Sequence, residues 1–241
     1  MIYVGTSGWS YAHWEGVLYP PGLPARDRLD CYLPRYITVE VNSTFYHWPS
    51  DQTFVRWQER LPVGFLFTVK APRGLTHGTR LYSPEKWLHI IQRGMQHLKE
   101  NCGVLLVQLP PAFGYDLARL TYFLACLPTG LQVAMEFRHP SWQQEAVFTL
   151  LEQYNVAYCV MSGAQLPCVL RATASFVYVR MHGPHTDYLY AGSYSDQDLA
   201  WWKERAAEWD GLGKNVFFYF NNDGEGNAVR NADTLKQMLA R

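Results

Sequence analysis

Composition places the 241-residue chain among globular proteins: hydrophobic residues make up 48% and charged residues 17%, a balance that excludes a disordered chain. The formal net charge is +0 and the pI is about 7.1, so nothing draws the whole chain toward nucleic acid or an anionic membrane. Five scattered cysteines without a C-x-x-C spacing argue against a disulfide framework or a zinc site and favour reduced thiols.

Strand and helix patterns alternate along the whole chain. Strands are predicted near residues 2–6, 37–42, 65–70, 103–109, 131–137, 156–161, 176–182 and 215–221. Helices are predicted near residues 26–34, 51–60, 84–100, 115–126, 143–153, 195–209 and 226–240, several of them opened by capping residues such as Ser50, Ser83 before Pro84, and Ser195. Only the segment after residue 161 lacks a helical pattern.

Eight apolar strands separated by helices indicate a parallel sheet covered by helices. The chain length fits one domain over residues 1–241, folded as a (β/α)₈ TIM-type barrel, because such barrels run to about 200–250 residues. An open doubly wound sheet is the alternative, but Gly5-Thr6-Ser7-Gly8 after the first strand lacks the dinucleotide-binding spacing. In a parallel barrel the carboxyl ends of all strands open on one face, where barrel enzymes carry their sites.

The chain enters its first strand at Ile2 without a basic and then apolar leader. No run approaches the ~20 apolar residues that are needed to span a bilayer. We therefore expect no membrane partner and a cytoplasmic location.

Polar and ionisable residues end several of the predicted strands. Because side chains alternate along a strand, the groups that share a side are Thr38, Glu40 and Asn42; Thr68 and Lys70; Glu136 and Arg138; and Arg180 and His182. Burying these charges together is costly unless they pair or face a solvated cavity. The pattern therefore predicts one polar site at the C-terminal face, with Glu40, Lys70, Glu136 and His182 as the candidate catalytic residues.

Further residues at the strand ends and in aromatic loops are candidates for binding a substrate. They are Trp9, Tyr11, Asn42, Tyr46, His77, Gln108, Arg138, Trp142, Arg180, Tyr188, Asn221 and Asn222, and Thr6, Ser7 and Tyr190 fall at the same predicted mouth. Aromatic walls suit sugar rings, nucleobases and apolar groups equally well.

Structural interpretations of these residues stay open beside the functional ones. Glu40 and Glu136 can pair with the cations in a network that only holds the barrel mouth rigid. Trp142 can close the barrel end by packing, and Asn221-Asn222-Asp223 can cap the last helix.

The charges favour an anionic ligand, because the three cations outnumber the two carboxylates. The cations are Lys70, Arg138 and Arg180, and the carboxylates are Glu40 and Glu136. No cofactor or metal site is predicted, since these cations would repel a metal ion. A divalent metal on Glu40, Glu136 and His182 is kept as the fallback. A lysine in a crowded cationic site can also have a lowered pKa and form a Schiff base with a carbonyl substrate.

Several ordered motifs resemble the YecE-like family, known as domain of unknown function 72. They are Gly5-Thr6-Ser7-Gly8-Trp9-Ser10-Tyr11, Val39-Glu40-Val41-Asn42-Ser43-Thr44-Phe45-Tyr46, Phe65 to Lys70 with Thr76-His77, Val107-Gln108-Leu109-Pro110-Pro111, Glu136-Phe137-Arg138-His139-Pro140-Ser141-Trp142, Tyr178-Val179-Arg180-Met181-His182-Gly183 and Tyr219-Phe220-Asn221-Asn222-Asp223. The resemblance implies a TIM-type barrel without an established activity. One departure is Met161-Ser162-Gly163, where the family commonly has Ile-Ser-Asp.

The leading hypothesis is an enzyme, such as a lyase, isomerase or hydrolase, that performs acid–base chemistry on a small phosphorylated or carboxylated polyol. One alternative is a metal-assisted barrel that processes phosphodiesters, with aromatic loops stacking bases; the neutral net charge weighs against it. The other alternative is a non-catalytic protein that binds a small molecule. The oligomeric state is not predicted.

Overall fold

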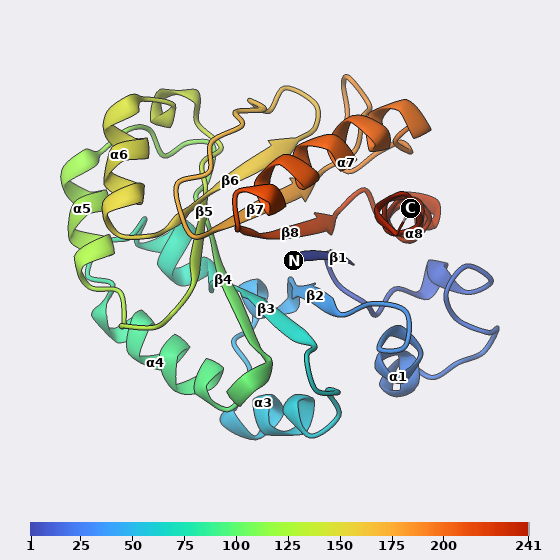
Figure 1. Ribbon diagram of the computed structural model, residues 1–241. Coiled ribbons are helices and arrows are strands. Elements are labelled where there is room, and N and C mark those ends of the chain that lie inside the picture. The colour runs from blue at the N-terminus through green and yellow to red at the C-terminus, as the bar shows by residue number, and fades with distance from the viewer. Residues whose placement is uncertain (241) are drawn as a thin grey trace.

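Eight parallel strands form one sheet in the computed structural model, which describes residues 1–240. The strands are β1 (Ile2–Thr6), β2 (Thr38–Val41), β3 (Leu66–Lys70), β4 (Cys102–Gln108), β5 (Val133–Glu136), β6 (Ala157–Ser162), β7 (Phe176–Met181) and β8 (Asn215–Phe220), ordered β1-β8-β7-β6-β5-β4-β3-β2 (Figure 1). A parallel bridge between Ser7 and Glu40, with the Gly8 amide donating to the Glu40 carbonyl at 2.7 Å, joins β1 to β2. The sheet therefore curls into a nearly closed barrel, and the predicted fold is confirmed.

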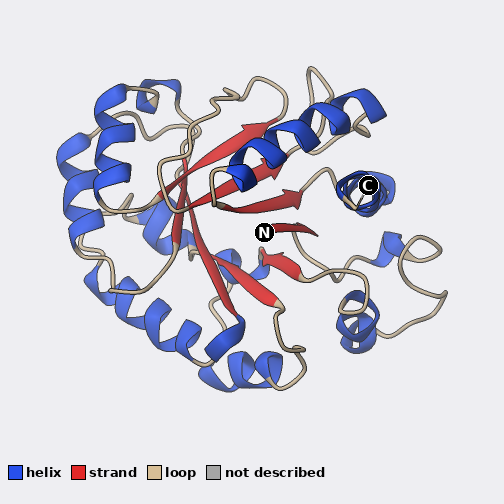
Figure 2. Cartoon of the chain, viewed as in Figure 1, coloured by secondary structure: helices blue, strands red, loops and turns tan. Residues whose placement is uncertain are grey.

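Helices follow one another around the outside of the strands (Figures 1 and 2). They are α1 (Arg28–Tyr32), α2 (Ser43–Tyr46), α3 (Asp51–Gln58), α4 (Glu85–Gln96), α5 (Leu117–Ala125), α6 (Glu145–Gln153), α7 (Asp196–Gly211) and α8 (Asn227–Leu239). Shorter 3₁₀ turns lie at Ala12–Trp14, Ala25–Asp27, Lys99–Asn101, Pro140–Trp142 and Gly224–Gly226, and a π-helical turn at Gly74–Gly78. Residues 163–175, all within the described part, contain no helix, as predicted.

The predicted helix starts are confirmed in part. Ser195 opens α7 with a complete capping box to Asp198, which satisfies two amides that would otherwise lack partners. The Ser50 hydroxyl instead lies 3.0 Å from the Thr53 hydroxyl and caps no backbone amide. The last helix begins at Asn227 after Gly226 in the left-handed conformation, so the reading of Asn221-Asn222-Asp223 as its N-cap is wrong.

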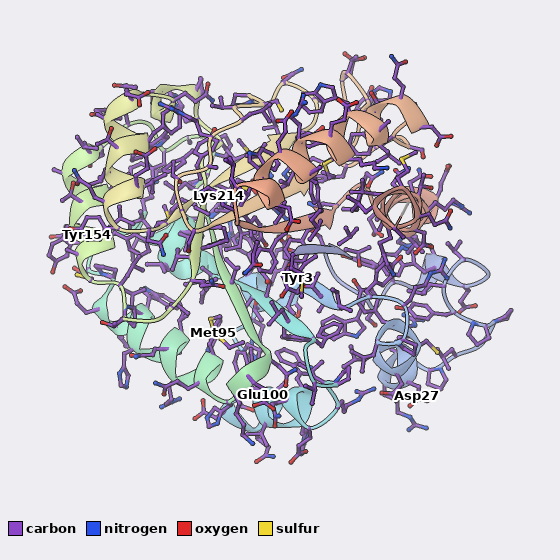
Figure 3. All side chains as sticks on the ribbon, in the orientation of Figure 1. Tyr3, Asp27, Met95, Glu100, Tyr154 and Lys214 are labelled. Carbon is purple, nitrogen blue, oxygen red and sulfur yellow. The ribbon has the colours of Figure 1, made fainter. Side chains whose placement is uncertain are left out.

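Alternation along the strands separates two layers of side chains. One set, including Val39, Val69 and Val107, packs outward against helix residues such as Met95. The other set fills the inside of the barrel and includes Tyr3, which stacks on Phe217 with ring centroids 4.8 Å apart. Figure 3 shows Tyr3 near the middle of the ring of strands and Met95 between α4 and the sheet. The inner set is apolar at one end and charged at the other, which places the polar residues inside the C-terminal mouth.

No helix within residues 1–240 combines the length and apolar character that crossing a membrane requires.

Candidate functional site

Arg180 lies between the two buried glutamates. Its Nε and Nη2 donate to Glu40 Oε2 and Oε1 at 2.9 and 2.7 Å, and its Nη1 donates to Glu136 Oε2 at 2.6 Å. All three side chains are at most 1% exposed. The inner face of β2, β5 and β7 thus carries one carboxylate–guanidinium–carboxylate bridge across the barrel.

Two hydroxyls complete the surroundings of Glu40. Ser7 Oγ donates to Glu40 Oε1 at 2.7 Å, and the Tyr178 hydroxyl donates to Oε2 at 2.6 Å. Ser7 falls at the predicted mouth without a predicted role, and Tyr178 is not predicted at all. The missed signal is strand parity, because Tyr178 is two residues before Arg180 and faces the same way.

Glu136 has a second set of partners on its other side. Arg138 Nε donates to Glu136 Oε1, and Arg138 Nη2 lies 3.3 Å from His182 Nε2. His182 Nε2 is 3.7 Å from Glu136 Oε2, and its Nδ1 is 3.2 Å from Asn221 Nδ2. Glu136, Arg138, His182 and Asn221, all predicted site residues, are therefore in direct contact at the ends of β5, β7 and β8.

The cations hold both glutamates ionised, and burial holds the histidine neutral. Burial alone would raise the pKa of Glu40, but the charge and hydrogen bonds of Arg180, with those of Ser7 and Tyr178, lower it overall. Burial likewise opposes ionisation of Glu136, yet Arg138 and Arg180 hold its pKa well below the usual range. Burial lowers the pKa of His182 to about 4, although Glu136 works against this shift.

Lys70 ends β3 and is the unpaired cation of the group. Its backbone carbonyl accepts from Thr44 Oγ1 at 2.7 Å, and its Nζ lies 4.6 Å from the centre of the Phe45 ring. Within residues 1–240 no side chain forms a hydrogen bond or ion pair with Nζ under the usual distance limits. Burial, and then the Arg180 charge, lowers the pKa of Lys70 to about 8, while both glutamates oppose the shift.

Four predicted binding residues line one small pocket at the ends of β1 and β2. Trp9, Tyr11, Asn42 and Tyr46 surround a cavity of about 280 Å³, together with Gly8, Ser10, Val41 and Ser43. Asn42 Oδ1 is buried and, within the described residues, accepts no hydrogen bond. Tyr46 is 81% exposed at the rim. The pocket has aromatic walls, and Asn42, which borders it, carries a buried acceptor.

His77 and Gln108 also lie near the charged residues, His77 beside Lys70 and Gln108 beside Glu136. The His77 ring packs edge-on against Phe45 with centroids 5.0 Å apart, and burial, followed by the Lys70 charge, lowers its pKa. Gln108 is half-buried on β4 and pairs in register with Glu136 on β5. Gln108 belongs to the predicted ring of polar strand ends, whereas His77 lies in the turn Gly74–Gly78 that follows β3.

Two predicted binding residues are enclosed by protein. Trp142 is fully buried, donates from Nε1 to the Phe113 carbonyl at 2.7 Å and packs on Phe137, so the packing interpretation describes it. Buried Asn222 ties the loop at Gly192 to Asn231 of α8. Neither has a surface to offer a ligand, because both are enclosed by protein.

Tyr188 extends from the loop after β7 and contacts His185 in that same loop. Its neighbour Tyr190 is the residue that reaches the site. The Tyr190 hydroxyl lies 3.4 Å from Arg138 Nη2, and its ring lies 5.4 Å from that of His182. Tyr188 is the predicted binding residue of this loop, but it is Tyr190 that contacts Arg138 and His182.

The fallback metal set does not form a cation site. The Arg180 guanidinium occupies the space between Glu40 and Glu136 and uses their oxygens as acceptors. No group of three metal-ligating side chains is found among residues 1–240. The donor set of Glu40, Glu136 and His182 therefore suits an internal arginine and not a divalent ion.

A larger groove of about 700 Å³ lies beside α7, outside the predicted site. Its walls include Ser162, Gly163, His185, Gln197 and Trp201. None of the predicted site residues lines it.

Gly163 stands where a carboxylate was expected from the resemblance. A Cβ at this position would lie 2.7 Å from the Cβ of His182 and 3.3 Å from Leu189 Cδ2. The close approach of β6 to β7 therefore leaves no room for an aspartate side chain here without a shift of His182.

Comparison with known proteins shows the family to which the chain is related. The family model for proteins of unknown function DUF72 matches residues 3–241 of this chain. UPF0759 protein YunF of Bacillus subtilis is 29% identical, covering 99% of this chain and 94% of the relative. UPF0759 protein YecE of Escherichia coli K12 is 30% identical over 143 residues, which are 59% of this chain and 50% of the relative.

Two crystal structures share the fold over the whole chain. A DUF72 family protein from Thermotoga maritima has a TM-score of 0.89 and 30% identity, with 100% of both chains covered. A DUF72 family protein from Enterococcus faecalis has a TM-score of 0.87 and 21% identity, with 100% of this chain and 96% of that chain covered. The resemblance inferred from the sequence motifs is confirmed.

Proposed function

The chain belongs to the family of proteins of unknown function DUF72, and from that premise we propose that it is a barrel enzyme performing acid–base chemistry on a small anionic polyol. The observation that carries the proposal is the unpaired amine of Lys70 beside an otherwise neutralised charge network. Arg180 and Arg138 balance Glu40 and Glu136. With His182 neutral, the protonated Lys70 leaves one excess positive charge, which a phosphate or carboxylate would offset.

Lys70 is also the group suited to proton transfer. A pKa of about 8 lies close to neutral pH, where a side chain both gives and takes protons effectively. The glutamates are ionised and already accept hydrogen bonds from Arg180. We therefore assign Glu40 and Glu136 to positioning Arg180, and the proton transfer to Lys70.

The pocket at Trp9, Tyr11, Asn42 and Tyr46 suits the polyol part of the substrate. A buried acceptor without a donor, such as Asn42 Oδ1, costs about 1–3 kcal/mol. A substrate hydroxyl would satisfy it. Aromatic side chains around the cavity would then cover the carbon skeleton.

Anion binding tests the proposal directly. We expect inorganic phosphate at millimolar concentration to raise the melting temperature of the parent protein, and Lys70→Met to weaken its binding at least ~10-fold, since the excess charge is lost. Lys70→Arg keeps the charge and should retain binding. Lys86→Met, at an exposed position on α4, is the matched control and should bind like the parent.

The other arms of the experiment separate the alternatives. Asn42→Ala should leave phosphate binding intact and weaken the binding of sugar phosphates. No phosphate effect on the parent, or equal binding by Lys70→Met, would overturn the proposal. Single-stranded DNA binding with a steep salt dependence would favour phosphodiester processing instead. Tight sugar-phosphate binding without turnover would favour a non-catalytic binding protein.

A further inference from the structure

The Lys70 amine is positioned by its neighbours, although no side chain among residues 1–240 forms a hydrogen bond or ion pair with it. Thr44 Oγ1 donates to both the Val41 and Lys70 carbonyls, at 2.9 and 2.7 Å, and so fixes the end of β3 against α2. The side chain then rests on Phe45, 4.6 Å from the ring centre. An aromatic ring positions the amine but forms no bond that an incoming ligand would have to break.

The surroundings of this amine increase the fraction that is uncharged. Burial and the fixed charges of Arg180 and Arg138 lower the pKa of Lys70 to about 8. At pH 7 about one such amine in ten is uncharged, compared with about one in 3,000 for a lysine of ordinary pKa. The uncharged amine is the form that attacks a carbonyl carbon.

We propose that Lys70 forms an imine with a small aldehyde or ketone that also carries an anionic group. This inference rests on the function proposed above and specifies the substrate class as carbonyl compounds. The Nζ lone pair forms a bond to the carbonyl carbon while the carbonyl π pair moves to oxygen, which takes the proton lost from nitrogen. The resulting carbinolamine expels its oxygen as water, with a second proton from nitrogen, and leaves a carbon–nitrogen double bond. No oxidant or reductant is required.

In this proposal His77, the titratable side chain that shares the Phe45 ring with Lys70, carries these protons. Its ring packs against the same Phe45 ring as Lys70, and the Lys70 charge contributes to lowering its pKa. A neutral imidazole accepts a proton from the attacking nitrogen and returns it to the departing oxygen. Arg138, at 6% side-chain exposure, is already paired with Glu136, so the anionic group would be held through guanidinium hydrogens that Glu136 does not use.

Reductive trapping tests the imine. The protein is incubated with glyoxylate and sodium cyanoborohydride, digested, and mapped by mass spectrometry. We expect Lys70 to be modified at least ~10-fold faster than Lys86, with a rate that rises as pH increases toward 8 because more amine is uncharged. Lys70→Arg should lose this fast modification, whereas Lys86→Arg should keep it. Modification of Lys70 no faster than Lys86 would overturn the inference.

An uncharged probe separates this inference from the proposed function. Glycolaldehyde has the carbonyl group of glyoxylate without its charge, so we expect it to be trapped more slowly at Lys70. Phosphate binding with no trapping of either aldehyde would overturn the imine and leave the anion site standing. Equal trapping of both aldehydes without any phosphate effect would support the imine and overturn the anion site.

Discussion

Arg180 binds Glu40 through two parallel hydrogen bonds, from Nε at 2.9 Å and from Nη2 at 2.7 Å. Both side chains are at most 1% exposed. A paired geometry of this kind is among the strongest that a carboxylate and a guanidinium can form. Because Arg180 also donates to Glu136, loss of either glutamate leaves a buried cation with less compensation. The stability of the barrel mouth therefore depends on these three residues together.

Replacing a bridging glutamate should destabilise the fold. We expect Glu40→Gln and Glu136→Gln each to lower the free energy of unfolding by about 3–5 kcal/mol, the cost of breaking a buried ion pair from one side. Urea denaturation at pH 7 measures this. Glu152→Gln, at an exposed position on α6, is the control and should change stability by less than ~0.5 kcal/mol. Bridging variants as stable as the control would show that the charges are not coupled.

As pH falls, the free energy of unfolding should decrease first because of His182 and then because the glutamates become protonated. The folded pKa of His182 is about 4 against an ordinary value of 6.5, so between these pH values the unfolded chain binds the proton and the folded chain does not. Stability is therefore lost as pH falls from 6.5 toward 4. Below that, protonation of Glu40 and Glu136, whose folded pKa values are also lowered, removes more. His182→Gln should show a shallower loss between pH 6.5 and 4 in urea denaturation; an unchanged slope would contradict this.

Replacing Lys70 should not destabilise the fold, in contrast to replacing Glu40 or Glu136. Its folded pKa of about 8 lies below the ordinary 10.5, so the unfolded chain binds more protons between these values and the stability of the parent rises with pH there. Lys70→Met should be at least as stable as the parent at pH 7 and should lack this rise. Thermal melts from pH 7 to 10.5 test both points. A variant destabilised by more than ~1 kcal/mol would reveal a stabilising partner for Lys70.

Gly163 should resist any side chain because its missing Cβ accommodates His182. A methyl group there would meet the His182 Cβ at 2.7 Å, and relieving such overpacking costs about 1–3 kcal/mol. We expect Gly163→Ala to be destabilised by that amount in chemical denaturation. Gly211→Ala is the matched control, since no atom lies within 4 Å of a Cβ at that position. Equal stability of the two variants would mean that the β6–β7 contact adjusts freely.

Local patterns were sufficient to predict the barrel and the inner face of its strands. The alternation of apolar strands with helices can be recognised in short segments of the sequence. The Ser195 capping box likewise involves residues only three apart. Strand parity is equally local, so Glu40, Glu136, Arg180 and His182 could be assigned to one side before any contact was known. Tyr178 follows from the same rule, since it is two residues before Arg180, but it was not among the predicted site residues.

Tertiary structure alone decided which of these groups neutralise one another. Glu40 and Arg180 are 140 positions apart in the chain and Glu136 and Arg180 are 44 apart, so their pairing depends on the order and stagger of strands around the barrel. The same closure left the Lys70 amine without a hydrogen-bond or ion-pair partner among residues 1–240 and enclosed Trp142 and Asn222 in protein. A sequence determines the direction in which a side chain leaves its strand, because that depends on adjacent residues. Which charge it meets across the barrel depends on the packing of all eight strands.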